Sequence, residues 1–286
     1  MLRLHDFYHL PPVAEYVRQW VDEPSSLALI CGLDPQPTQS QRTVPSQRFS
    51  GRVTVFRLMV NEFLAGHPGA VCMMITEDRQ LSRFARQFRD QAEVLLVDGS
   101  TTYEDHVAAA LEQGPDLLVI DPLSAFTLPP MMIAVEAGLN VLSQIDVPYR
   151  GSAVFHQLAE WGLPSEGLGQ TLSLISVQHV HGLCPHCRQP ATIQPEHWMQ
   201  LTRRYPDLDQ NLKHLTRASG PTESGFFFES RGCPTCQETG YIGEKLVFDF
   251  LRVETPLLPP YQYRSQLMMS DYLLQLAKEG VLSLTD

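Results

Sequence analysis

The stretch PDLLVIDPLSAFTLPPMMIAVEAGLNVLSQID, residues 115–146, holds two short apolar runs, DLLVI at 116–120 and NVLSQI at 140–145, separated by a helical pattern. Short uninterrupted apolar runs are typical of strands that are buried on both faces of a sheet. Strands that alternate with helices predict an α/β fold with a mostly parallel sheet. The alternation continues upstream, where the further runs are LALIC at 27–31, AVCMMI at 70–75 and EVLLV at 93–97.

Helical patterns occupy the intervals between these runs. In the 52–64 segment, Phe56 and Val60 lie on one apolar stripe. A later helix is expected to begin after Thr101, the predicted N-cap, with Glu104 in the capping-box position. Four regions are expected: a lead-in linker and helix at 1–26, the α/β core at 27–183, a cysteine-bearing module at 184–245, and a C-terminal strand and helix at 246–286.

The composition excludes several classes of protein. Lys and Arg number 21 against 32 Asp and Glu, and the resulting net charge of −11 argues against general binding to nucleic acid or anionic lipid. Hydrophobic residues make up 43% of the chain, which is enough for a sizeable core and excludes wholesale disorder. No run reaches the roughly 18–20 apolar residues of a membrane helix, and the first residues lack the apolar segment of a secretory signal. We therefore expect a cytoplasmic protein, for which any association with a membrane would go through a partner.

Arginines recur at helical spacing in one segment, at Arg79, Arg83, Arg86 and Arg89. Such a stripe could contact nucleic acid, but the acidic total and the few aromatic residues nearby argue against it. We expect a solvated helix face or a subunit contact.

The six cysteines fall into two groups. Cys31 and Cys72 lie inside apolar runs and are expected to be buried thiols. The others form two pairs, CPHC at 184–187 and CPTC at 233–236. In a reducing compartment, paired Cys-x-x-Cys segments predict zinc ligands, and four sulfur ligands leave no open coordination position. The sequence therefore predicts a structural zinc site with the ligands Cys184, Cys187, Cys233 and Cys236.

The residues around the second cysteine pair resemble a known family. RGCPTCQETGYIG at 231–243, with LCPHC at 183–187, closely resembles the tetracysteine segment of the hexameric assembly ATPases of type II secretion and type IV pilus biogenesis. QGPDLLVID at 113–121 is similar to the Walker B strand of that family, and ITED at 75–78 is similar to its aspartate box. The resemblance implies a RecA-like, P-loop-type core, a zinc-binding subdomain and a short C-terminal helical part.

The resemblance also implies where a nucleotide would lie. Its vestigial site would comprise Gly32, Gly51, Arg52, Thr54, Glu77 and Asp121. Phosphoryl transfer requires a lysine on the phosphates and a hydroxyl on magnesium, but Arg52 and Val53 stand at these two positions. The loop before them contains prolines, which have no amide hydrogen to offer a phosphate; they are Pro35, Pro37 and Pro45.

The Walker B region departs from the family pattern as well. Asp121 falls on the family's glycine position, and Pro122 stands in place of the catalytic glutamate. Asp146 stands where the family has a histidine, and His179 and His181 stand where it has arginines. Several catalytic motifs are therefore broken while the scaffold motifs remain.

These replacements favour a pseudo-ATPase that serves pilus or secretion machinery as an interaction or regulatory component. One alternative is a divergent but active motor that uses Arg52, Thr54, Glu77 and Asp121, and another is a zinc-ribbon nucleic-acid binder. We expect Zn²⁺ as a structural cofactor and do not expect ATP with Mg²⁺ to serve as one. The partners that the resemblance implies are a true pilus or secretion ATPase, its inner-membrane platform protein, and further copies of this chain; we expect neither nucleic acid nor direct membrane insertion.

Overall fold

The computed structural model describes residues 11–24, 27–32, 50–88, 90–147, 150–151, 153–163, 171–192, 195–204, 227–253 and 264–284. The chain divides into two compact units. The first is formed by Met1–Val177 with Asp249–Gln266, and the second by Gln178–Phe248 with Leu267–Asp286. The second unit contains all of the 184–245 range that the sequence predicts as a cysteine module, and it also takes the C-terminal helix.

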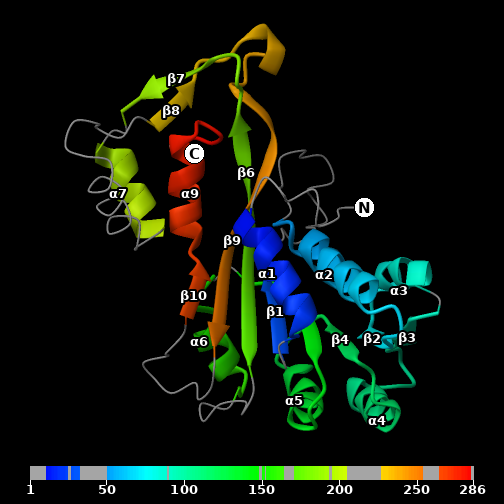
Figure 1. Cartoon of the computed structure of the whole chain (residues 1–286). Coiled ribbons are helices and arrows are strands. Elements are labelled where there is room, and N and C mark those ends of the chain that lie inside the picture. The colour runs from blue at the N-terminus through cyan, green and yellow to red at the C-terminus, as the bar shows by residue number, and fades with distance from the viewer. Residues whose placement is uncertain are drawn as a thin grey trace. The chain divides into compact units, whose positions relative to one another are not determined.

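An eight-stranded sheet has the strand order β10-β9-β6-β1-β5-β4-β2-β3 (Figure 1). Pairing is parallel between β6 and β1, β1 and β5, β5 and β4, β4 and β2, and β2 and β3. The prediction of an α/β fold with a mostly parallel sheet is therefore confirmed. The strand bounds are β1 Leu27–Cys31, β2 Cys72–Thr76, β3 Ala92–Leu96, β4 Leu117–Asp121, β5 Val141–Ile145, β6 Leu172–Leu183, β9 Tyr241–Val253 and β10 Arg264–Leu267.

The central strands are buried throughout, as the apolar runs predict. All residues of β1, β2, β4 and β5 are buried. The expectation that the 93–97 run is buried on both faces is wrong, because β3 is the last strand of the sheet and leaves Glu93 and Leu96 exposed. Within the first unit, the strand runs therefore differ in burial according to their place in the sheet.

The order of the strands determines which face each connecting helix covers. The chain moves outward along the sheet from β1 to β2 and β3, and then returns through β4 and β5 to β6. Right-handed crossovers therefore place α2 and α3 on one face and α4, α5 and α6 on the other. Side chains of α4, α5 and α6 share one core cluster with the strands, as this placement requires. The helix bounds in the first unit are α1 Pro11–Asp22, α2 Arg52–Gly66, α3 Arg79–Ala85, α4 Tyr103–Gln113, α5 Leu128–Glu136 and α6 Ala153–Glu160.

The start of α4 lies one residue later than the sequence predicts. Thr102, not Thr101, is the N-cap, and its Oγ1 accepts a hydrogen bond from the Asp105 N–H at 3.2 Å. The Asp105 carboxylate accepts in return from the Thr102 N–H at 2.9 Å. Asp105 therefore fills the capping-box position expected for Glu104, because the box needs an acidic residue three positions after the true N-cap.

The described part of the second unit contains a two-stranded sheet and two helices. Strand β7, Arg188–Ala191, pairs antiparallel with β8, Phe227–Ser230, and the helices are α7, Pro195–Arg204, and α9, Met269–Lys278. The Arg188 guanidinium donates to the carbonyl oxygens of Glu279 and Gly280 at 3.1 and 2.6 Å, just after α9 ends. These bonds fasten the end of the C-terminal helix to β7. None of the helices in the described ranges combines the length and the apolar character needed to cross a membrane.

Candidate functional site

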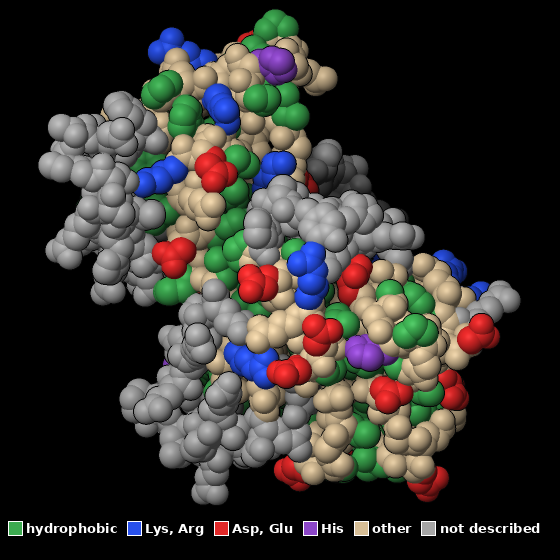
Figure 2. All heavy atoms as spheres, in the orientation of Figure 1, with side chains coloured by type: hydrophobic (Ala, Val, Ile, Leu, Met, Phe, Trp, Pro, Cys, Tyr) green, Lys and Arg blue, Asp and Glu red, His purple; other side chains and the backbone are tan. Residues whose placement is uncertain are grey.

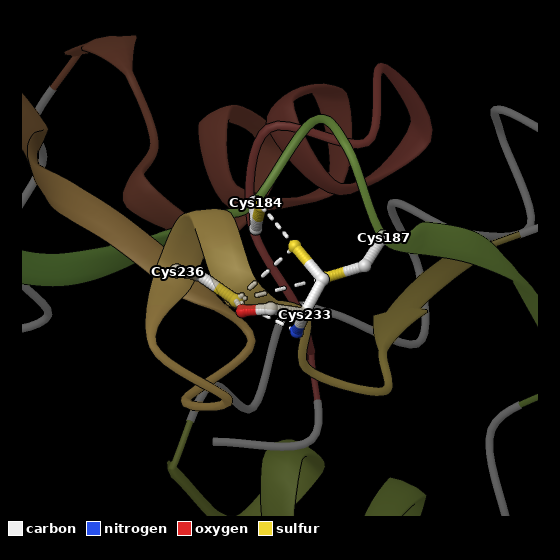
Figure 3. A group of neighbouring side chains, drawn as sticks. All are labelled: Cys184, Cys187, Cys233 and Cys236. Atoms are coloured by element: carbon white, nitrogen blue, oxygen red, sulfur yellow. Dashed lines mark hydrogen bonds between the residues drawn. The ribbon is translucent and has the colours of Figure 1, made fainter.

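The four cysteines of the two Cys-x-x-Cys pairs converge in the second unit. Figure 3 shows their side chains pointing toward one another from two separate turns, and all four Sγ atoms lie within 4.8 Å of one another. The Sγ–Sγ distance is 3.8 Å for Cys184 and Cys233, 3.8 Å for Cys187 and Cys236, and 3.7 Å for Cys233 and Cys236. The cysteines are free thiols, so the group is not a pair of disulfides.

The spacing of these sulfur atoms fits a tetrahedral zinc ion. Zinc–sulfur bonds of about 2.3 Å in a tetrahedron place the sulfur atoms roughly 3.8 Å apart, close to the shortest separations in the cluster. All four donors are thiols, which is the ligand set of closed structural sites. The residues present therefore fit the predicted metal, which would link the end of β6 to the turn before β9.

Local hydrogen bonds favour the thiolate form that a metal needs. Burial opposes ionisation of the Cys236 thiol. The backbone N–H groups of Cys233 and Gly240 each lie 3.2 Å from its Sγ and favour the thiolate, as do the neighbouring thiols. Together these contacts outweigh burial and lower the pKa of Cys236 to about 6. The backbone at Cys236 likewise lowers the pKa of Cys233. The Ser230 hydroxyl, 2.8 Å away, lowers the pKa of the Cys187 thiol, but burial and the other three cysteines together raise it to about 11. One thiolate is thus preformed, and metal binding must displace protons from others.

The backbone of the second turn explains the glycine before Cys233. Gly232 has a φ of +87°, which L-residues rarely adopt. A Cβ atom there would also lie 2.6 Å from the Glu238 carbonyl oxygen. Glycine is therefore needed on both counts for the turn to bring Cys233 and Cys236 together.

Two histidines near the first cysteine pair have partners other than the sulfur group. The His179 Nδ1 lies 3.6 Å from the Glu244 Oε2, and the His181 ring packs on Tyr241 with ring centroids 5.2 Å apart. Both histidines thus contact residues of β9, Glu244 and Tyr241. The other two cysteines, Cys31 and Cys72, are buried in β1 and β2, and burial raises the pKa of Cys31 to about 12.

A second polar cluster lies in the first unit, at the carboxyl ends of the parallel strands. Asp121 ends β4, is only 4% exposed, and pairs in register with Thr76, which ends β2. The Thr76 hydroxyl donates to Asp121 Oδ2 at 3.2 Å, and the Gln144 side-chain amide donates to Asp121 Oδ1 at 2.6 Å. The Tyr103 hydroxyl donates to the Asp121 carbonyl oxygen at 2.9 Å. Both carboxylate oxygens of Asp121 are therefore engaged by neighbouring side chains.

The electrostatics of Asp121 follow from this environment. Burial raises the pKa of its carboxyl, while the hydrogen bonds from Gln144 and Thr76 and the positive charge of Arg52 oppose the rise. Arg52, at the first position of α2, is itself buried. Arg52, which stands at the lysine position of the resemblance, and Asp121 thus bring opposite charges together at the carboxyl ends of the strands.

The connection between β1 and α2 returns close to its own starting point. Gly32, directly after β1, lies so near Ser50 that an added Cβ would be 2.5 Å from the Ser50 Oγ. The Ser50 Oγ also accepts the backbone N–H of Arg52 at 3.1 Å. The segment between these ends, residues 33–49 with the three prolines expected to spoil a phosphate loop, lies outside the described residues.

The structure brings some of the predicted nucleotide-site residues together and leaves others apart. Gly32 and Gly51 flank the return of the chain, and Arg52 and Asp121 share the polar cluster. Thr54 is half-buried in α2 and also borders a groove toward α3, whereas Glu77 is exposed. Sequence reasoning missed Thr76 and Gln144, because they contact Asp121 only through the order of the strands.

Comparisons with known proteins point to one family. Residues 90–279 match the family model described as Type II/IV secretion system protein. The type IV pilus assembly ATPase TfpB of Acinetobacter baylyi is 26% identical over 157 residues, which cover 54% of this chain and 24% of that protein. The match thus spans about a quarter of the curated relative's length.

Two solved structures also align. The Legionella pneumophila ATPase DotB aligns with a TM-score of 0.41 and 13% identity, over 59% of this chain and 44% of that one. The pilus retraction motor PilT with bound ADP aligns with a TM-score of 0.41 and 16% identity, over 60% of this chain and 47% of that one.

Proposed function

Since the chain belongs to the Type II/IV secretion system protein family, we propose that it is a non-catalytic member: a pseudo-ATPase that acts through protein interactions in pilus or secretion machinery. One observation carries the proposal, the internally paired carboxylate of Asp121. The partners we propose are a true motor ATPase of the family, the platform protein on which such a motor works, or further copies of this chain.

The bonding of Asp121 supports a loss of catalysis. An acid that holds magnesium or orients water must have an oxygen lone pair that the ion or the water can reach. Asp121 is 4% exposed, and its two carboxylate oxygens already accept from Thr76 and Gln144. Breaking one hydrogen bond to a charged group costs about 1.5–3 kcal/mol. The next residue, Pro122, has no ionisable side chain to take over the role.

The charge of Arg52 supports the same conclusion. In an active site of this class, a cation at the start of the helix faces the phosphates. Here burial raises the pKa of the Asp121 carboxyl, and Arg52 lies close enough for its positive charge to oppose that rise. Two opposite charges that offset each other in a buried position offer little net attraction to a triphosphate.

The cysteine cluster supports a retained scaffold. Its four thiols leave no position at which a bound metal could activate water, so the zinc we propose there would be structural. Removal of the zinc by a chelator would then change the stability of the fold, and no catalytic step would depend on the metal. The proposed role therefore needs the zinc-bearing unit and the parallel sheet as folded surfaces.

The test is nucleotide binding and hydrolysis by the purified, zinc-loaded chain. We expect ATP with Mg²⁺ to leave the melting temperature unchanged, because only a ligand bound by the folded state raises it. We also expect phosphate release to be the same for the unaltered chain, Asp121→Ala, and the control Glu112→Gln, whose side chain is exposed on α4. Turnover on the order of 1 per second, within the usual range of enzymes, abolished by Asp121→Ala but not by the control, would instead establish the divergent active motor.

A further inference from the structure

A groove in the first unit runs between α2 and α3, which Figure 1 shows near each other. Its volume is about 710 Å³, within the range of about 300–1,000 Å³ that is typical of ligand sites. Its lining residues come from α2, α3 and the turn after α3: Thr54, Arg57, Leu58, Gln80, Arg83, Phe84 and Gln87.

Arg57 lies over the Phe84 ring in this groove. Its guanidinium carbon lies 5.5 Å from the centroid of the Phe84 ring, which is the distance of a cation–π contact. The Nε atom of Arg57 is buried and has no hydrogen-bond partner among the described residues. A buried donor without an acceptor is costly, so the groove gains free energy from any ligand that supplies one.

The other polar side chains of the groove add to its positive character. Arg83 is exposed on α3, and neither it nor Arg57 forms an ion pair within the described parts of the chain. Gln80, Gln87 and Thr54 supply neutral donors and acceptors, and the described lining includes no acidic residue. The charge of the described lining is therefore positive, whereas the whole chain has a net charge of −11. Figure 2 shows acidic side chains around α4 and α5 and basic side chains over α3.

We propose that this groove binds an acidic segment of a partner protein, with carboxylates on Arg57 and Arg83. Leu58 and Phe84 provide an apolar floor for side chains between the acids, and the glutamine amides suit a peptide backbone. A nucleic acid fits less well, because every nucleotide adds a phosphate while the described lining offers two arginines, so the other phosphates would be left facing a chain of net charge −11. The inference builds on the proposed interaction role, but it does not require the loss of ATP hydrolysis.

The test is fluorescence anisotropy of the full zinc-loaded chain with a short labelled peptide of alternating glutamate and leucine, in the absence of nucleotide. Saturable binding is expected, and it should weaken as salt rises because salt screens the ion pairs. We expect Arg57→Gln to weaken binding about tenfold or more through loss of a partly desolvated charge pair, and Arg83→Glu to do the same because it places two like charges against each other. The control is Arg79→Glu, which introduces the same charge change on the same helix outside the groove lining, and less than about a twofold effect is expected.

Several outcomes would overturn the proposal. Equal weakening by Arg83→Glu and Arg79→Glu would show general charge attraction and no groove site. Tighter binding of a labelled single-stranded oligonucleotide, lost in the same two groove variants, would assign the groove to phosphates. Binding that does not saturate at about 1 mM peptide would also refute the proposal, because an affinity that weak is too low even for a transient contact. Because no nucleotide is present in this experiment, none of these results bears on the ATPase test. Arg83 is exposed, so the Arg83→Glu variant is expected to fold.

Discussion

Replacing Gly32 with alanine tests whether the chain between β1 and α2 returns as tightly as the structure has it. The added Cβ would lie 2.5 Å from the Ser50 Oγ, 2.6 Å from the Ser50 Cβ and 3.0 Å from the Val177 carbonyl oxygen. The first two distances are far below ordinary van der Waals contact, and the Ser50 Cβ cannot move away by simple side-chain rotation. The helix start would have to shift.

The size of the effect follows from these contacts. Forcing an extra carbon into a packed site typically costs about 1–3 kcal/mol. For a chain of this size each kcal/mol lowers the melting temperature by roughly 2–4 °C, so Gly32→Ala should lower it by roughly 2–12 °C. The control Gly69→Ala meets no atom within 4 Å and should change it little.

Thermal unfolding of the zinc-loaded variants, followed by circular dichroism, measures the difference. Ser50→Gly removes both of the closest atoms, so it should recover part of the loss when combined with Gly32→Ala, even though alone it forfeits the hydrogen bond to the Arg52 N–H. The coupling between the two positions is what the double-mutant cycle reports. If Gly32→Ala has the same melting temperature as Gly69→Ala, or if Ser50→Gly fails to recover stability in the double variant, then Gly32 and Ser50 do not approach as closely as the structure has them.

Three further results are expected. Thr102→Ala should cost about 1 kcal/mol of stability in urea unfolding through the lost cap, more than Thr101→Ala, and the reverse order would contradict the position of the box. In the metal-free protein, thiolate absorbance should appear with a midpoint near pH 6 and be lost in Cys236→Ser, whereas a first midpoint above pH 8 would refute the preformed thiolate. The stability of the unaltered chain relative to Asp121→Asn should fall as pH rises from about 4 to about 7, because burial raises the pKa of the Asp121 carboxyl and the stability tied to its neutral form is lost over that range. Urea midpoints whose difference stays constant between about pH 4 and about pH 7 would contradict this.

The sequence predicts the buried strands well because the apolar residues of each run by themselves indicate burial. The residues of β1, β2, β4 and β5 are apolar enough on both faces to require cover on both. The similar run around Val94 gives no sign that it ends the sheet, because edge position depends on strand order. Strand order comes from packing across the whole unit and not from any one run.

The two polar sites differ in the same way. The cysteine pairs are visible because the Cys-x-x-Cys spacing is local, and only the approach of the two pairs needs the fold. The partners of Asp121 are 45 and 23 residues away in sequence, and Thr76 and Gln144 carry no motif of their own. The arginine stripe expected from Arg79 to Arg89 is also interrupted, since α3 ends at Ala85 and a 3₁₀ turn follows, while Arg89 lies outside the described residues.

Both units are assembled from stretches that are not contiguous in the chain, since Asp249–Gln266 returns to the first and Leu267–Asp286 to the second. A fragment that starts at residue 178 therefore keeps both stretches of the second unit but also carries Asp249–Gln266 without the rest of the first unit, and a fragment that ends at residue 266 keeps the whole first unit with only part of the second. Isolating the zinc-bearing part by itself calls for joining the 178–248 and 267–286 stretches through a new linker, because a simple C-terminal fragment used in a pull-down would also expose the 249–266 stretch, which packs in the first unit.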